Sequence, residues 1–100
     1  MELRHIRYFK AVAEEKNFTR AAEKLAIAQP PLSRQIQDLE AELGTELFVR
    51  SPHKVTLTEE GELFLQYASQ ILDLVNKSEE EVREMREGLT GTLYIASVEG

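Results

Sequence analysis

The order of apolar and polar positions predicts two helices in the first quarter of the chain. Apolar residues recur at helical spacing over residues 2–15, with charged residues on the remaining faces, and the apolar face is formed by Ile6, Phe9, Val12 and Ala13. A second, short helix is predicted over about 18–25, since most residues there are good helix formers and Asn17 or Thr19 can cap it. The two adjacent alanines of this helix favour a tight corner with a neighbouring helix.

A third helix is predicted to begin around Pro30 and Pro31 and to end at Leu43. Proline is well tolerated in the first turn of a helix, where its missing N–H would be unpaired, and Gly44 supplies a C-terminal stop. The apolar stripe recurs at spacings of four, three and four and consists of Leu32, Ile36, Leu39 and Leu43. The opposite face is polar and presents Ser33, Arg34, Gln37 and Asp38.

A hairpin and a long helix are predicted in the second half of the chain. Two short β-prone runs, 47–49 and 55–57, lie on either side of a polar turn, which is typical of a small hairpin. Thr58 can then cap a fourth helix that runs about 29 residues, or about 44 Å, because after Gly61 in its first turn no glycine or proline occurs before Gly88. Residues 89–100 are strand-like and bounded by glycines, so we expect them to begin a truncated domain.

The fourth helix is so long that the three preceding helices cannot cover its apolar residues along its whole length. Its apolar residues recur at threes and fours and form a broad stripe, which consists of Leu63, Phe64, Tyr67, Ile71, Leu74, Val75, Val82 and Met85. A second copy of the same helix in antiparallel orientation is the simplest cover. We therefore expect a homodimer that forms through these residues.

Together these elements predict a mainly α fold. Two helices joined by a short turn, with a hairpin directly after them, indicate a winged helix-turn-helix of three helices and a two-stranded wing, followed by a long dimerisation linker helix. We expect the winged helix-turn-helix over residues 1–58, the linker helix over 59–88 and the start of a further domain over 89–100.

The net charge of −6, taken alone, argues against nucleic acid as a partner. The charge is, however, distributed unevenly along the chain. Residues 1–58 hold nine Lys and Arg against eight Asp and Glu, whereas residues 59–100 hold three against ten. The acidity therefore belongs to the C-terminal part, and the charge of the whole chain says little about what the N-terminal part binds.

Composition excludes several kinds of site. There is no cysteine, and the two histidines, His5 and His53, are far apart in sequence, so we expect no metal centre and no cofactor. No convergent set of catalytic groups is evident, and we expect no enzyme. No apolar run approaches the roughly 20 residues of a membrane span and the N-terminus is charged, so we expect a cytoplasmic protein without membrane contact.

The polar face of the third helix suits the major groove of double-stranded DNA. Arg34 can donate two hydrogen bonds to guanine, and Gln29 or Gln37 can bond the edge of adenine. On the hairpin, a cluster of basic residues could neutralise phosphates or enter the minor groove, namely Arg50, His53 and Lys54. A winged helix used for protein–protein contact remains the alternative, and the salt dependence of DNA affinity would separate the two.

The run over residues 18–50 is FTRAAEKLAIAQPPLSRQIQDLEAELGTELFVR, and VTLTEEG follows it closely. This run, together with the opening MELRHIRYFKAVAEE, resembles the DNA-binding module of the LysR-type transcriptional regulators. The ordered combination of AA, QPPLSRQI, LE, LG, LF, R and LT..G is far more specific than a bare helix-turn-helix pattern. The resemblance covers residues 1 to about 88.

The resemblance implies a sequence-specific regulator that binds an inverted-repeat operator as a homodimer, or as a tetramer in a full-length protein. It implies that a small-molecule effector binds only to a C-terminal domain, of which residues 89–100 would be the first strand. It also assigns DNA contacts, in the third helix to Gln29, Pro30, Pro31, Ser33, Arg34 and Gln37, and in the wing to Arg50, His53 and Lys54.

Overall fold

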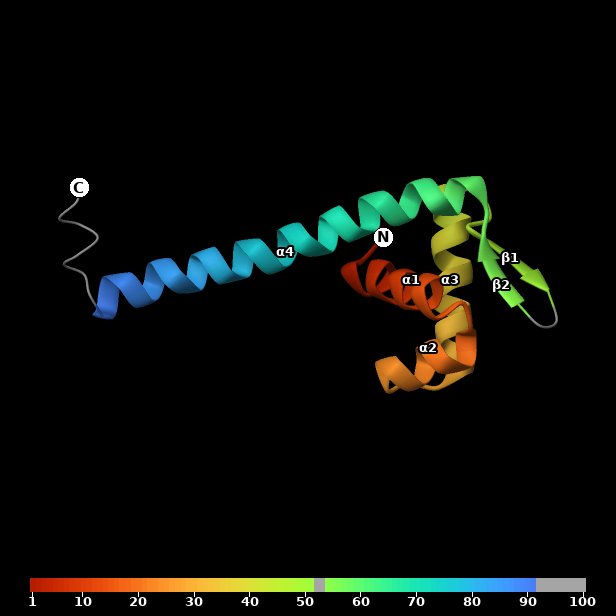
Figure 1. Ribbon diagram of the computed structural model, residues 1–100, viewed down its shortest axis with the longest axis horizontal. Coiled ribbons are helices and arrows are strands. Elements are labelled where there is room, and N and C mark those ends of the chain that lie inside the picture. The colour runs from red at the N-terminus through yellow and green to blue at the C-terminus, as the bar shows by residue number, and fades with distance from the viewer. Residues whose placement is uncertain (52–53, 92–100) are drawn as a thin grey trace.

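The computed structural model describes residues 1–51 and 54–91, and it contains the four predicted helices and the predicted hairpin in the predicted order (Figure 1). The elements are α1 (Leu3–Glu15), α2 (Phe18–Leu25), α3 (Gln29–Leu43), β1 (Phe48–Ser51), β2 (Lys54–Leu57) and α4 (Glu59–Gly91). Three helices and an antiparallel hairpin form the domain, and α4 leads away from it, so the mainly α winged helix-turn-helix fold is confirmed.

The ends of the first three helices follow from local chemistry. The side chain of Asn17 accepts a hydrogen bond from the backbone N–H of Arg20 at 2.8 Å, so Asn17 caps α2 and Thr19 does not. Gly44 ends α3 in the left-handed conformation, with a φ of 74°. Ala26 ends α2 in the same conformation at a φ of 61°, where a side chain is strained.

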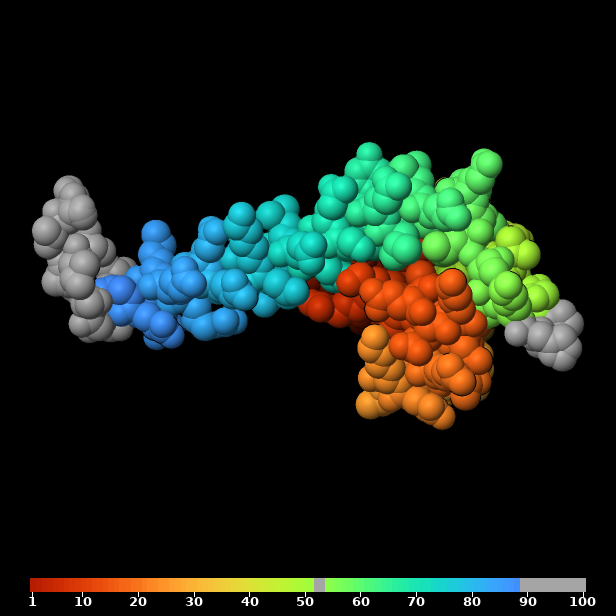
Figure 2. All heavy atoms as spheres, viewed as in Figure 1, coloured from red at the N-terminus to blue at the C-terminus, as the bar shows by residue number. Residues whose placement is uncertain are grey.

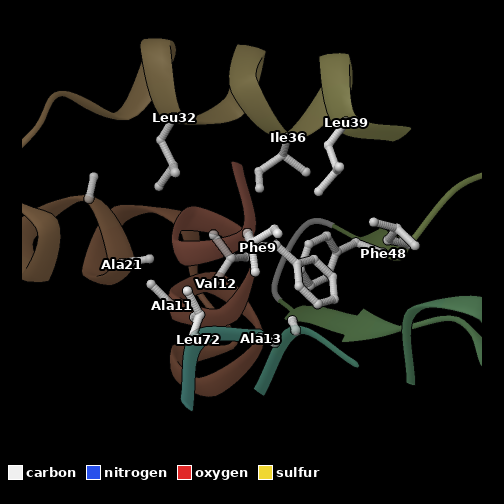
Figure 3. Close-up of a cluster of buried hydrophobic side chains, with 14 residues drawn as sticks. Phe9, Ala11, Val12, Ala13, Ala21, Leu32, Ile36, Leu39, Phe48 and Leu72 are labelled. Atoms are coloured by element: carbon white, nitrogen blue, oxygen red, sulfur yellow. The ribbon is translucent and has the colours of Figure 1, made fainter. Parts of the chain in front are cut away.

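The core lies between α3 and α1. In Figure 3 three members of the α3 stripe, Leu32, Ile36 and Leu39, point from the helix toward Phe9 and Val12 of α1, and all three are fully buried. The fourth predicted member, Leu43, is 38% exposed. The ring of Phe48, at the start of β1, lies 5.2 Å from that of Phe9. Burial of one face fixes the rotation of α3 about its own axis and so decides which residues face outward.

The hairpin is joined firmly to the start of α4. β1 pairs antiparallel with β2, and Arg50 lies opposite Val55. At the base, the N–H of Thr58 donates to the carbonyl of Leu47 at 3.0 Å, and the hydroxyl of Thr58 accepts from the N–H of Gly61 at 2.9 Å. Thr58 therefore caps α4, as predicted.

α4 packs on α1 through its N-terminal half and then extends beyond the domain (Figure 2). The molecule is consequently elongated, with extents of 61 × 26 × 19 Å. α4 passes Gly88 and ends at Gly91, three residues beyond the predicted end, because an isolated glycine weakens a helix without stopping it. A strand was expected within residues 89–100. Residues 89–91 belong to α4 instead, and residues 92–100 lie outside the described residues.

Candidate nucleic-acid interface

A tight turn connects α2 to α3. The N–H of Ile27 donates to the carbonyl of Ala22 at 3.0 Å, which closes the turn after Ala26. Ala21 and Ala22 are buried, and these small side chains let α2 approach its neighbours closely. In Figure 1, α2, the N-terminal end of α3 and the hairpin all extend downward from α4.

The exposed face of α3 carries most of the residues predicted to contact DNA. Pro30, Pro31, Arg34 and Gln37 are exposed, whereas Gln29 and Ser33 are half-buried. Pro30, Arg34 and Gln37 follow one another at intervals of four and three, so they project from one side of the helix.

Arg34 is available for an external partner. Within residues 1–51 and 54–91, no ion pair or side-chain hydrogen bond engages its guanidinium. Other basic residues of the domain are partly neutralised, since Lys10 pairs with Glu14 at 3.3 Å and Lys24 with Glu15 at 3.6 Å. The free positive charge of the domain is therefore concentrated on fewer residues than the sequence count suggests.

The start of α3 offers fewer backbone donors than an ordinary helix. A helix N-terminus normally presents several free N–H groups that can bind phosphate. Pro30 and Pro31 occupy the first turn of α3 and have no N–H, so the donors left there are those of Gln29 and Leu32. The helix end therefore offers little to an anion, and the exposed side chains of α3 offer more.

The wing residues differ in their surroundings. Lys54 is exposed, and its ammonium group has no ion pair among the residues that the structure describes. The hydroxyl of Ser51 donates to the carbonyl of Lys54 at 2.9 Å and closes the hairpin below its tip. His53 lies outside the described residues.

Arg50 is already engaged inside the protein. Its Nη2 lies 3.3 Å from Oε1 of Glu40, and its guanidinium carbon lies 5.3 Å from the ring centroid of Phe18. The side chain is 35% exposed. The sequence suggested a free cation on the wing, whereas Arg50 joins β1 to α2 and α3.

Glu40 is the residue that sequence reasoning missed. It is only 8% exposed, and its Oε2 accepts hydrogen bonds from the N–H of Leu47 at 2.8 Å and from that of Phe48 at 3.2 Å. A glutamate in the last turns of an amphipathic helix is normally solvated. The motif quoted above contains both partners, since its LE ends in Glu40 and its single R is Arg50, but the motif alone fixes no contact between them.

The amino terminus of the chain is hydrogen-bonded to the end of α3. The amino group of Met1 donates to Glu42 at 2.8 Å, and this hydrogen bond lowers the pKa of the Glu42 carboxyl. Burial opposes the shift, and the positive charge of the amino group adds to it. The pair holds the N-terminus on the last turn of α3.

The apolar stripe of α4 divides into two faces. Phe64 and Ile71 are half-buried against the domain's own core, where the ring of Phe64 meets that of Phe9 at 5.0 Å. Val75 is half-buried as well. The exposed members are Leu63, Tyr67, Leu74, Val82 and Met85. The inward face is completed by residues that the sequence analysis did not single out, namely Leu65, Ala68 and Leu72.

A shallow hollow of about 210 Å³ adjoins the exposed face. Leu43 and Leu47 line it on one side, and Leu63 and Tyr67 of α4 line it on the other. Its apolar walls are suited to receive a further apolar side chain.

The described residues form neither a metal centre nor a membrane span. No cluster of three or more possible metal ligands occurs there. α4 is long but too rich in charge to cross a bilayer, and no other described helix is long and apolar enough to do so.

Comparison with known proteins agrees with this geometry. Residues 3–62 match the family described as bacterial regulatory helix-turn-helix protein, lysR family. The chain is 54% identical over 95 residues to the HTH-type transcriptional regulator BudR of Klebsiella aerogenes, covering 95% of this chain and 66% of the relative. It is 60% identical over 77 residues to BenM of Acinetobacter baylyi, covering 77% of this chain and 25% of the relative. The chain thus spans only part of these relatives.

Similar structures have been solved in complex with DNA. The DNA-binding domain of BenM bound to catB site 1 superimposes with a TM-score of 0.86 at 53% identity, covering 88% of this chain and 99% of that one. The DNA-binding domain of CbnR in its DNA complex gives a TM-score of 0.83 at 44% identity, covering 86% and 99%.

Proposed function

The chain belongs to the lysR family of bacterial regulatory helix-turn-helix proteins, and from this premise we propose that it is a sequence-specific DNA-binding transcriptional regulator. The observation that carries the proposal is the exposed face of α3, on which Arg34 has no partner within the described residues. The DNA complexes of the BenM and CbnR domains support it. The protein would act in the cytoplasm, where the DNA is.

In this proposal α3 lies in the major groove and reads bases. Arg34 donates two hydrogen bonds to the O6 and N7 of guanine, and Gln37, one turn further along, bonds the N6 and N7 of adenine. Ser33 and Gln29 are half-buried and reach only the adjacent backbone or the nearest base. Pro30 and Pro31 start the helix and offer apolar contact to thymine methyl groups.

The wing would position the domain on the DNA backbone. Lys54 is exposed and unpaired within the described residues, so it can neutralise a phosphate. His53, which directly precedes Lys54 in the sequence, would add a second polar contact. Arg50 was assigned the same role from the sequence, but Glu40 already pairs with its guanidinium.

Two copies of the chain would bind together through the exposed face of α4. In an antiparallel pair centred on Leu74, Leu63 lies opposite Met85 of the second copy and Tyr67 lies near Val82. All these side chains are exposed in the single chain, and pairing would bury them. The twofold axis then presents both α3 helices to two inverted half-sites. Tetramer formation and effector binding belong, in this proposal, to a further C-terminal domain.

The salt dependence of DNA affinity tests this function. Fluorescence anisotropy with a labelled duplex gives the affinity at several salt concentrations, and a plot of log K against log salt should fall steeply. The duplex is the one that the chain itself enriches from a random-sequence library. Arg34→Ala should reduce its preference for this duplex. A chain that enriches no sequence and binds DNA with no salt dependence would instead favour a winged helix used for protein contacts.

A further inference from the structure

Glu40 connects α3 directly to the base of the wing. Its carboxylate sits in the last turns of the helix, and one oxygen accepts two backbone N–H groups, those of Leu47 and Phe48, at 2.8 and 3.2 Å. The segment that enters β1 is therefore held by a side chain of the helix that carries Arg34. Any tilt of the hairpin at its base must stretch these two hydrogen bonds.

Arg50 completes the connection from the side of the strand. Side chains alternate along a strand, so Arg50 shares a face with Phe48, whose ring is fully buried. That face turns toward the domain, where Arg50 meets Glu40 of α3 at 3.3 Å and the ring of Phe18 of α2 at 5.3 Å. Lys54 pairs with Ser51 in the ladder and so belongs to the opposite face of the hairpin.

We propose that Glu40 and Arg50 form a positioning pair that fixes the wing relative to α3, and that Arg50 affects DNA binding through Glu40 and not by contact with a phosphate. The proposal rests on the proposed function and revises the role that the sequence assigned to Arg50. A buried carboxylate is stable only with hydrogen-bond donors and a counter-charge, and here two backbone N–H groups and one guanidinium supply them.

The two roles of Arg50 predict opposite effects of Glu40→Gln. If Arg50 contacts phosphate, the substitution removes a competing negative charge near the DNA and releases the guanidinium, so binding becomes tighter. If the pair positions the wing, the substitution breaks the ion pair and weakens both N–H bonds to the strand, which share one carboxylate oxygen, so binding becomes weaker although a negative charge has been lost.

The first experiment measures the wing in the absence of DNA. The chain has no cysteine, so spin labels can be attached at Asp38→Cys on α3 and Thr56→Cys on β2, both exposed positions. Glu40→Gln and Arg50→Gln should each broaden the distribution of distances between the labels. Lys54→Gln, which removes a cation from the other face of the hairpin, should not. Arg50→Lys keeps a cation near Glu40 and should restore part of the narrow distribution.

Circular dichroism establishes first that each variant is folded at the temperature of measurement. If a single substitution unfolds the domain, Arg50→Lys and Glu40→Asp provide milder variants for the same comparison. A distance distribution that stays unchanged in folded Glu40→Gln and Arg50→Gln chains would overturn the positioning pair.

The second experiment measures DNA affinity on two duplexes, the one that the unmodified chain enriches from a random library and a shuffled version of it. Glu40→Gln and Arg50→Gln should each weaken binding to the enriched duplex about tenfold, and the double variant should be no weaker than either single variant. The ratio of the two affinities should fall, because a displaced wing disturbs the register of α3. Lys54→Gln should weaken binding to both duplexes alike.

Tighter binding by Glu40→Gln, with a loss for Arg50→Gln that persists in the double variant, would show that Arg50 contacts phosphate. If the unmodified chain enriches no duplex, the proposed function fails, and the label distances alone decide whether the pair positions the wing.

Discussion

Gly61, in the first turn of α4, lies directly against the backbone carbonyl of Leu47, with no room for a side chain between them. The same carbonyl accepts the N–H of Thr58, and Glu40 holds the N–H of Leu47. One short segment between α3 and β1 is therefore fixed by α3 on one side and by the start of α4 on the other. The linker helix, the wing and α3 are joined at this point.

Gly61→Ala should destabilise the domain by about 1 to 3 kcal/mol, because the added methyl group would overlap the Leu47 carbonyl and force the turn to move. Gly88→Ala is the matched control. Gly88 lies within α4 and has open space around it, so alanine there should stabilise the helix by up to about 1 kcal/mol. Urea denaturation followed by circular dichroism measures both. Equal effects of the two substitutions would contradict the close contact at Gly61.

Ala26→Gly should raise the stability of the domain by about 0.5 to 1 kcal/mol. Ala26 has a φ of 61°, a left-handed conformation that is strained by a side chain and relaxed by glycine, although glycine also gains freedom in the unfolded chain. Gly44→Ala tests the same effect in reverse. Gly44 has a φ of 74° and no atoms near its missing side chain, so the loss, about 1 kcal/mol, is purely conformational. Thermal unfolding of both variants should show shifts of opposite sign.

Arg34→Ala should weaken binding to the enriched duplex by about 1 to 3 kcal/mol and leave the melting temperature unchanged, since the side chain is exposed and unpaired among the described residues. Anisotropy titration gives the first quantity and calorimetry the second. Asp38→Ala, on the same helix, serves as a control for a change of surface charge. A folded Arg34→Ala chain with unchanged affinity would remove Arg34 from the interface.

Gln37→Ala should alter sequence preference more than general affinity for DNA, because an amide that bonds adenine reads a base and neutralises no charge. Enrichment from a random library, performed in parallel with the unmodified chain, measures the preference. The same preferred sequence from both chains would count against base reading by Gln37.

Leu74→Asp should convert a dimer into monomers. Leu74 is 66% exposed in the single chain, so an aspartate there should disturb the contact with a second copy and not the fold of the chain itself. Ile71→Asp is the less informative variant, because Ile71 is half-buried against its own domain and the charge would also destabilise the fold. Asn76→Asp adds the same charge about 200° around the helix and should leave the dimer intact. Sedimentation equilibrium at micromolar concentration distinguishes these results. A monomeric unmodified chain would contradict the pairing.

What the sequence could predict was local. The stripe Leu32, Ile36 and Leu39, and the stop at Gly44, follow from periodicity and backbone preference alone, and all were confirmed. Thr58 was confirmed as a cap for the same reason. Each of these features depends on residues within a few positions of one another, so the sequence of a single helix or turn is enough to predict it.

What the sequence could not predict depends on contacts between distant elements. The sequence placed all the apolar residues of α4 in one stripe. In the structure Phe64 and Ile71 pack against the domain's own core, whereas Leu74 is exposed. This division depends on how α1 packs against α4, which the spacing within α4 does not determine. The sequence assigned Arg50 to DNA contact and gave Glu40 no role. Their ion pair depends on the hairpin packing against α3 and α2. Charged residues carry no periodic signal of burial.

Hydroxyl-radical footprinting of the chain on its enriched duplex tests most directly the central claim, that two copies place two α3 helices on inverted half-sites. We expect two protected segments on one face of the duplex, with centres one helical turn apart, about 10 base pairs, or a multiple of it. Both segments should disappear together when Leu74→Asp is used at the same concentration. A single protected segment, occupied equally well by the Leu74→Asp monomer, would contradict the account.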